Sequence, residues 1–240
     1  MELTAAGVFR RYEEIRPRLP AMPDGVETRT ASGLSEIASE FDVFFFDAFG
    51  VLNVGDSVIP GAPERIAALR ASGKSVFVVT NAATQDRFAL QRKYAAMGFD
   101  FTQDEIVSSR AILTASLAHV GDVAQWAVML PDGGSRDGLP SNVLTLDGDT
   151  ALFWDADGYL FLSSKGWDAQ RQERLVARLQ KRPCPVLVGN PDLVAPREYG
   201  LSKEPGFFAH DILDRTGCAV RFFGKPFGNA FETAIAAASA

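Results

Sequence analysis

The sequence predicts an α/β protein in which a parallel sheet forms the core and a second α/β lobe is inserted into that core. Two short runs, 42–48 and 75–80, are almost entirely apolar and rich in Val and Phe, as in strands buried on both faces of a parallel sheet. Segments with helical spacing and a terminal glycine follow these runs. After about residue 112 the chain becomes richer in Gly, Asp and Ser, which indicates a separate and more loop-rich lobe.

The first lobe has the pattern of strand, helix and strand in order. The segment PGAPERIAALRASG follows the first run, with apolar residues at helical spacing and Gly73 at the position of a helix C-cap. Such a unit forms a right-handed crossover between parallel strands. The same pattern predicts a helix over 84–97, ended by Gly98, and a third strand over 104–109.

The second lobe is predicted to hold several short strands, a helix over 167–180 and a strand over 185–189. A further helix over 207–217 precedes the run 219–223, which we expect to return to the first sheet. We therefore predict a first part of the core over 1–111, a cap over 112–204 and a second part of the core over 205–240.

The composition excludes several classes of protein. The 240 residues are 47% hydrophobic and 22% charged, which is typical of a globular chain rather than a disordered or fibrous one. The net charge of −6 argues against a nucleic-acid partner, because backbone binding needs clustered Lys and Arg. Two isolated cysteines, no secretory signal and no apolar run of membrane-spanning length lead us to expect a cytoplasmic protein without a membrane partner.

Residues able to carry chemistry stand at three predicted strand ends. Asp47 ends the first run and is followed closely by Gly50, which lets the chain leave the sheet sharply. Thr80 and Asn81 end the second run, and Lys225 follows the run 219–223. Because parallel sheets bind ligands at the carboxyl ends of their strands, we expect these side chains to converge. A carboxylate, hydrogen-bond donors and a fixed cation are what phosphoryl transfer to a carboxylate requires.

The segments DAFGVLNVGDSVIPGA, VVTNAAT, GNPD and FFGKP occur in this order from about residue 42 onward. They resemble the class IIA group of the haloacid dehalogenase (HAD) superfamily, which includes bacterial nucleotide and sugar-phosphate phosphatases and pyridoxal phosphate phosphatases. The resemblance implies a Rossmann-like HAD core with a large α/β cap inserted between the second and third motifs. It also implies a metal-dependent phosphatase of small phosphate esters.

The resemblance implies a role for each residue that matches a motif. Asp47 would be the nucleophile that forms an aspartyl phosphate, and it would hold Mg²⁺ together with the backbone carbonyl of Phe49. Thr80 and Asn81 would bind the phosphoryl oxygens, and Lys225 would neutralise charge between the phosphoryl group and Asp47. The GNPD segment, 189–192, is expected to be a structural turn.

Phe49 departs from the D-x-D motif of the family's phosphatases, in which a second Asp transfers a proton. A phenyl ring cannot do so, and general acid–base help is worth about 10²–10⁴ in rate. We therefore expect impaired activity, with the smallest loss on an aryl phosphate. Two alternatives stay open: a binding protein for a phosphorylated metabolite, and, less favoured, a haloacid dehalogenase, because dehalogenase relatives carry an aromatic residue here.

The family's fourth motif, a G-D strand that completes the Mg²⁺ site, has no match before Ala240. One Asp and one carbonyl would hold Mg²⁺ poorly, so we expect either an incomplete metal site or, preferably, a sequence truncated before that motif. The expected partner is a small phosphorylated metabolite, and relatives of this kind often pair through their caps into a homodimer.

A second segment, Asp155-Ala156-Asp157-Gly158, matches D-x-D-G in letters alone. No strand ending in Thr or Ser follows it at a suitable distance, and it lacks the ligand ladder of a calcium loop. We predict a hairpin turn within the cap. The two histidines, His119 and His210, lie in helical segments and are expected to be surface or capping residues rather than ligands.

Overall fold

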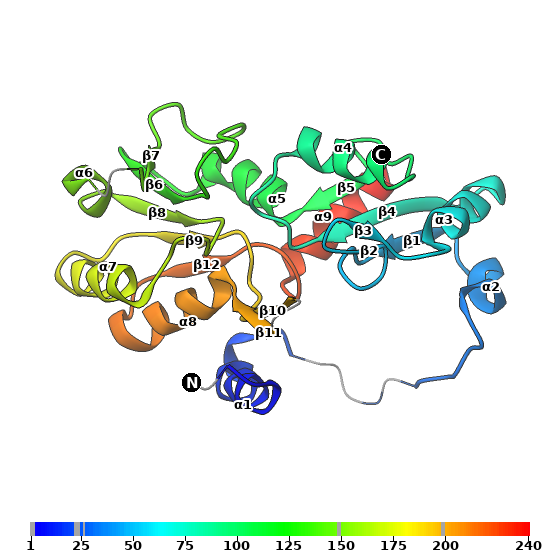
Figure 1. Cartoon of the computed structure of the whole chain (residues 1–240), viewed down its shortest axis with the longest axis horizontal. Coiled ribbons are helices and arrows are strands. Elements are labelled where there is room, and N and C mark those ends of the chain that lie inside the picture. The colour runs from blue at the N-terminus through cyan, green and yellow to red at the C-terminus, as the bar shows by residue number, and fades with distance from the viewer. Residues whose placement is uncertain (1–2, 22–24, 26, 148–149, 198–199) are drawn as a thin grey trace.

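The computed structural model describes residues 3–21, 25, 27–147, 150–197 and 200–240. Two parallel sheets and three layers of helices alternate through the molecule (Figure 1). The outer layer on the first sheet consists of α3 (Ala62–Ala71) and α4 (Arg87–Ala96). The layer between the two sheets consists of α5 (Ser109–Ser116) and α9 (Gly228–Ala238). The layer outside the second sheet consists of α7 (Ala169–Lys181) and α8 (Pro205–Thr216). The mixed α/β class and the parallel sheets agree with the sequence-based prediction.

The first sheet has the order β1-β4-β5, with β1 spanning Val43–Phe46, β4 spanning Ser75–Thr80 and β5 spanning Ile106–Ser108. Both strand pairs are parallel, as the predicted crossover units require. Along β4, Val76 and Val78 pack in the cluster under α3 and α4, whereas Val79 packs toward α5 and α9. The alternation is the period of two expected for a strand covered on both faces.

The second sheet has five parallel strands in the order β12-β9-β8-β6-β7. Tyr159 and Phe161 of β8 pack against α7 and α8, and Leu160 packs on the opposite face toward α5 and α9. One buried cluster therefore joins the two sheets through the middle helices. The strands are β6 (Trp126–Met129), β7 (Leu144–Thr145), β8 (Gly158–Phe161), β9 (Val186–Val188) and β12 (Val220–Phe222).

The strand over 220–222 does not return to the first sheet, so that expectation is wrong. β12 pairs in parallel with β9, placing Val220 opposite Val186 and Phe222 opposite Val188. The helix before it, α8, packs against α7 and β9. These contacts place 205–222 with the second sheet, and α9 is the element that returns to β4 and β5. The physical reason is that Val220 and Phe222, both partly buried, pack against the apolar cluster under α7 and α8. The predicted division at residues 112 and 205 otherwise stays a prediction.

Two further details differ from expectation. Phe45 of β1 is 39% exposed, because β1 is an edge strand of its sheet and is not covered on both faces. The segment 155–158 joins the short helix α6 (Ala151–Trp154) to β8, so it is a helix–strand turn and not a hairpin. Its carboxylates, Asp155 and Asp157, both pair with Arg182, which gives them a local structural partner.

Two segments near the N-terminus lie at opposite ends of the molecule. α1 (Ala5–Ile15) lies below α8, and α2 (Leu34–Ile37) lies near β1 (Figure 1). Arg11 and Arg18 both pair with Asp214 of α8, which fixes this end of the chain to the second sheet's helices. The remaining elements are the hairpins β2–β3 (Asn53–Val54, Ser57–Val58) and β10–β11 (Val194–Arg197, Gly200–Lys203), and the 3₁₀ turns Arg16–Arg18, Ala38–Glu40 and Leu117–His119.

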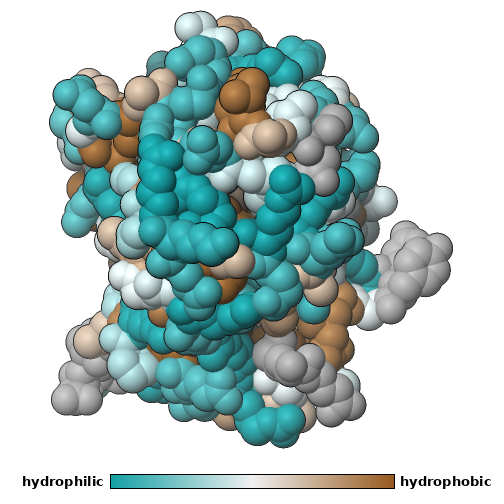
Figure 2. Space-filling view, turned by 90° about the vertical axis from the view of Figure 1, so that its left-hand side faces the viewer, coloured by the Kyte–Doolittle hydropathy of each residue, from teal (hydrophilic) through white to brown (hydrophobic). Residues whose placement is uncertain are grey.

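The end of the molecule that carries the second sheet is mostly hydrophilic, with apolar atoms in small scattered patches (Figure 2). Among the described helices, none combines the length and the apolar character needed to cross a membrane. His210 differs from the expected surface or capping residue: it is fully buried in α8, its ring stacks on Phe222 at 4.7 Å, and neither ring nitrogen has a hydrogen-bond partner among the residues that the structure describes.

Candidate functional site

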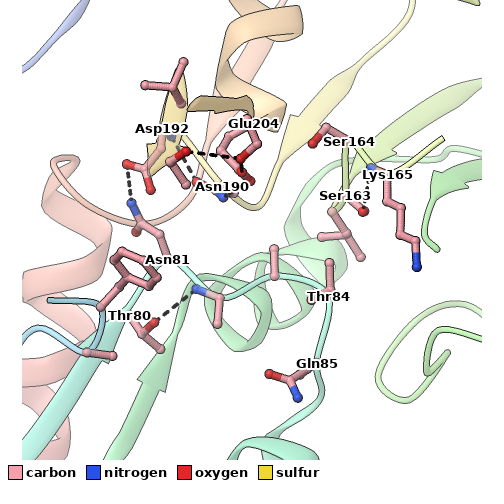
Figure 3. Close-up of a pocket in the computed structure, with 18 of the residues that line it drawn as sticks. Thr80, Asn81, Thr84, Gln85, Ser163, Ser164, Lys165, Asn190, Asp192 and Glu204 are labelled. Atoms are coloured by element: carbon pink, nitrogen blue, oxygen red, sulfur yellow. Dashed lines mark hydrogen bonds between the residues drawn. The ribbon is translucent and has the colours of Figure 1, made fainter. Parts of the chain in front are cut away.

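A cleft of about 1230 Å³ lies where the carboxyl ends of the strands of both sheets face each other. Its first wall holds the predicted residues Asp47, Thr80, Asn81 and Lys225 together with Phe49. The facing wall comes from the ends of β8 and β9 and from the loop before α8, and Figure 3 shows side chains from both walls pointing into one space. Residues far apart in the sequence therefore share one solvent-filled cavity.

Asp47 and Thr80 leave the first sheet at the same edge. Asp47 directly follows β1, and its Oδ1 accepts a hydrogen bond from Ala48 N at 2.7 Å. Thr80 is the last residue of β4, and its Oγ1 accepts a hydrogen bond from Ala82 N at 3.2 Å. Because β1 and β4 pair in parallel, both side chains point out above the end of the sheet.

Lys225 reaches this edge through Asn81 rather than through a strand of the first sheet. Asn81 Oδ1 accepts a hydrogen bond from Lys225 N at 2.8 Å, and Asn81 Nδ2 donates to Lys225 O at 3.0 Å. The Lys225 ammonium donates to Val79 O at 2.8 Å and contacts the Asp47 carboxylate. The predicted convergence of carboxylate, hydroxyl, amide and ammonium is thus present, held by a side-chain clamp between the two sheets.

The loop after Asp47 supplies no second carboxylate to the cleft. Phe49 is 36% exposed and lines the cavity with its ring. The nearby Asp56 lies in the β2–β3 hairpin, where its exposed carboxylate pairs with Lys93 at 3.1 Å. Across the described ranges, no group of three or more His, Cys, Asp and Glu side chains is arranged to hold a metal ion.

The facing wall holds an acidic residue that the sequence reasoning treated only as part of a turn. Asp192, four residues beyond the end of β9, lines the cleft, and its Oδ1 accepts a hydrogen bond from Asn81 Nδ2 at 3.0 Å (Figure 3). Glu204 lines the same wall and accepts hydrogen bonds from Asn190 and from Ser202. The available signal was that Asp192 follows the carboxyl end of a buried strand, as Asp47 does.

Burial changes the protonation of several groups around the cleft. Desolvation raises the pKa of the Asp192 carboxyl to about 6, partly offset by the hydrogen bond from Asn81 and by the charge of Lys225. Desolvation likewise raises the pKa of the Tyr94 phenol to about 12, and Tyr94 hydrogen-bonds with Thr80. The site therefore contains one carboxyl that titrates close to neutral pH.

Together these groups can bind and polarise a small phosphorylated anion. Hydroxyl, amide and ammonium groups at one end of the cleft can stabilise charge on the phosphoryl oxygens, and the Asp47 carboxylate, which contacts the ammonium, is a group that can act as a nucleophile. The rest of the cavity has room for an organic substituent of moderate size.

Comparison with known proteins gives a consistent family. The model of the family described as haloacid dehalogenase-like hydrolase matches residues 44–137. Chronophin of Mus musculus is 26% identical over 213 residues, which cover 86% of this chain and 73% of chronophin. Phosphoglycolate phosphatase 1A, chloroplastic, of Arabidopsis thaliana is 31% identical over 98 residues, or 41% of this chain. The chain spans only 27% of the length of that plant protein.

Solved structures share the fold at low sequence identity. A possible sugar phosphatase of the HAD superfamily from Cytophaga hutchinsonii superposes with a TM-score of 0.77 at 23% identity, covering 88% of this chain and 77% of that one. A glycerol phosphate phosphatase from Mycobacterium tuberculosis, in complex with magnesium, has a TM-score of 0.64 at 19% identity and covers 85% of this chain and 60% of that one. Both likenesses concern the arrangement of strands and helices.

Proposed function

Because the chain belongs to the class IIA group of the haloacid dehalogenase superfamily, we propose that it hydrolyses small phosphate esters and that Asp47 carries the phosphoryl group in between. One observation carries this proposal: the Lys225 ammonium contacts the Asp47 carboxylate at the edge where Thr80 and Asn81 also lie. A nucleophile and the groups that stabilise a transferred phosphoryl are thus within one end of one cleft.

The two oxygens of Asp47 are in different environments. Oδ1 accepts hydrogen bonds from Ala48 N and from the Lys225 ammonium. Within the part of the chain that the structure describes, Oδ2 has no donor, so it is the oxygen that attacks phosphorus as the ester P–O bond breaks. Water then attacks the phosphorus of the aspartyl phosphate, which releases inorganic phosphate and restores the carboxylate. Lys225, Thr80 and Asn81 offset the charge on the phosphoryl oxygens in both steps.

Magnesium is implied by the family resemblance, with Asp47 and the carbonyl of Phe49 as its ligands. The described residues do not fit that ion by themselves, because they contain no group of three or more His, Cys, Asp and Glu side chains arranged to hold a metal, and Asp47 is already in contact with Lys225. Mg²⁺ bound in proteins takes several oxygen ligands, commonly carboxylates, waters and substrate phosphate. The proposed chemistry of Asp47, Thr80, Asn81 and Lys225 does not pass through the ion.

The proposal is tested by the release of 4-nitrophenolate from 4-nitrophenyl phosphate, followed by its absorbance. We expect turnover by the unmodified chain and no turnover above background for Asp47→Asn, because an amide oxygen does not form the covalent intermediate. Asp56→Asn is the matched control, since Asp56 is an exposed aspartate that does not line the cleft. Undiminished turnover by Asp47→Asn would contradict the proposal.

Phe49 favours one alternative: a protein that binds a phosphorylated metabolite without hydrolysing it, because Phe49 occupies the motif position at which the family's phosphatases have a proton-transferring Asp. Calorimetric titration separates the two functions. Saturable binding of a phosphorylated metabolite by the unmodified chain, with no release of inorganic phosphate, would favour the binding protein. The cytoplasmic location and the homodimer stay predictions.

A further inference from the structure

Asp192 faces the phosphate-binding end of the cleft from the second sheet. It lies in the loop that follows β9, and its Oδ1 accepts a hydrogen bond from Asn81 Nδ2 at 3.0 Å. The same Asn81 amide donates to Lys225 O at 3.0 Å. Asp192 is therefore one hydrogen bond away from the residue that clamps Lys225, and Figure 3 shows its side chain directed toward Asn81 across the cleft.

The peptide groups on either side of Asp192 are held by one contact within the same loop and by contacts from two other segments, α1 and α8. Asn190 Oδ1 accepts a hydrogen bond from Asp192 N at 3.0 Å, and the Tyr12 hydroxyl of α1 accepts one from Leu193 N at 3.2 Å. Gly206, in the first turn of α8, packs so closely that a Cβ there would lie 2.0 Å from Pro191 O. The carboxyl group is thus held in one position, as a group acting on a substrate must be.

The charged groups around Asp192 keep it available as an acid. Among the described residues Asp192 forms no ion pair; Lys225 attracts its negative form, whereas Asp47 and Glu204 repel it. The Tyr12 phenol also faces it from α1, and its own pKa is raised by burial. Desolvation is the largest effect on Asp192, and it holds the carboxyl pKa at about 6, so an appreciable fraction is protonated near neutral pH.

We propose that Asp192 is the proton-transferring residue of this site. It gives a proton to the leaving oxygen and then takes one from water, which the phenyl ring of Phe49 cannot do. This inference rests on the proposed phosphatase function. The organic part of an ester must extend away from Asp47, because attack and departure lie in line at phosphorus. That direction leads from the first sheet into the cleft, whose facing wall contains Asp192.

The proposed reaction has two steps. When Asp47 Oδ2 bonds to phosphorus, the P–O bond of the ester breaks, and the Asp192 carboxyl gives its proton to the leaving oxygen, so that a neutral alcohol departs. The resulting Asp192 carboxylate then takes a proton from water as the water oxygen bonds to phosphorus. The Asp47–phosphorus bond breaks, inorganic phosphate leaves, and both aspartates return to their starting states.

The test uses Asp192→Asn with two phosphate esters of different leaving group, the alkyl ester glycerol 3-phosphate and the aryl ester 4-nitrophenyl phosphate. The amide keeps an oxygen that can accept from Asn81 but carries no acidic proton. We expect turnover of glycerol 3-phosphate, followed by release of inorganic phosphate, to fall by about 10²–10⁴, because an alkoxide is a poor leaving group without an acid. With 4-nitrophenyl phosphate the first step should change less, giving a burst of 4-nitrophenolate equal to the enzyme concentration before slow turnover, because attack by water lacks a base.

The pH dependence gives a second readout that a structural role would not move. Turnover of glycerol 3-phosphate by the unmodified chain should decline as the pH rises above about 6, since Asp192 then loses the proton that it donates. That decline should be missing in Asp192→Asn. Asp56→Asn, the exposed aspartate outside the cleft, is the matched Asp-to-Asn control, and it should show no burst and keep the ratio of the two substrates.

The results separate the two proposals. Equal losses on both substrates without a burst, or no loss at all, would overturn the role of Asp192 while Asp47→Asn still abolishes turnover. If Asp47→Asn itself keeps full turnover, the covalent function fails, and the role of Asp192 falls with it.

Discussion

Gly224 is the position where the contact between the two sheets leaves no space for a side chain. Its φ is +117°, a backbone conformation that other residues rarely adopt. A Cβ at this position would lie 2.6 Å from Asn81 Oδ1 and 2.8 Å from Ser109 Cβ. Because Asn81 Oδ1 also accepts the hydrogen bond from Lys225 N, Gly224→Ala should push apart the clamp that brings Lys225 to Asp47.

The magnitude has two parts. Backbone strain in a sparsely populated conformation costs about 1–3 kcal/mol, and overpacking against neighbours that must move costs about 1–3 kcal/mol more. Gly217→Ala is the matched control, since its φ is +66° and no atom lies within 4 Å of the added Cβ. That control should show the strain of the left-handed region alone, about 1–2 kcal/mol.

Urea unfolding compares the stabilities of the two variants, and 4-nitrophenyl phosphate turnover compares their sites. We expect Gly224→Ala to lose more stability than Gly217→Ala and to lose turnover even under conditions where it is folded. Gly217→Ala should keep normal turnover. Equal stabilities, together with full activity of Gly224→Ala, would refute the reasoning that this glycine sets the position of Lys225.

Lys225→Met should lower turnover of 4-nitrophenyl phosphate by at least about 10², because it removes the cation beside Asp47. Lys181→Met on α7 is the control and should have little effect, so similar rates for the two variants would contradict the site. Burial lowers the pKa of His210 to about 4, so His210 binds a proton more readily in the unfolded chain than in the folded one. About 3 kcal/mol of folding stability should therefore be lost as the pH falls from about 6.5 to 4. In His210→Phe, followed by urea unfolding at each pH, this part of the acid sensitivity should be missing; an unchanged pH profile would count against it. MgCl₂ alone should not raise the melting temperature in a saturable way, because Asp47 is already paired; a saturable rise would show a metal site that the described residues do not reveal.

The local sequence predicted the strands of the first sheet and their parallel pairing. Apolar runs predicted β1 and β4 and their parallel pairing, because a strand covered on both faces is apolar along most of its length. The mixed run 104–109 predicted the shorter β5 from its place after a glycine-ended helix. The argument from apolar runs overstated β1, whose Phe45 is exposed. Whether a strand lies at the edge or in the middle of a sheet depends on its neighbouring strands, and the local sequence of one strand does not specify them.

The same limit applies to the second sheet. The run 219–223 predicted a strand but not the sheet to which that strand belongs. In the structure, its pairing with β9 places it in the second sheet. His210 was expected at the surface because a helical segment alone does not reveal which face is covered, and α8 turned out to bury it against Phe222.

The sequence by itself determined which chemical groups are present: a carboxylate, a hydroxyl and an amide after two strands, and an ammonium after a third. Only the tertiary structure decided that two hydrogen bonds of Asn81 hold Lys225 beside Asp47. It also decided that Asp192, which follows a strand of the other sheet, faces the same end of the cleft. The physical reason is that strand ends within one parallel sheet converge by local geometry, whereas contacts between two sheets depend on how their shared helices pack.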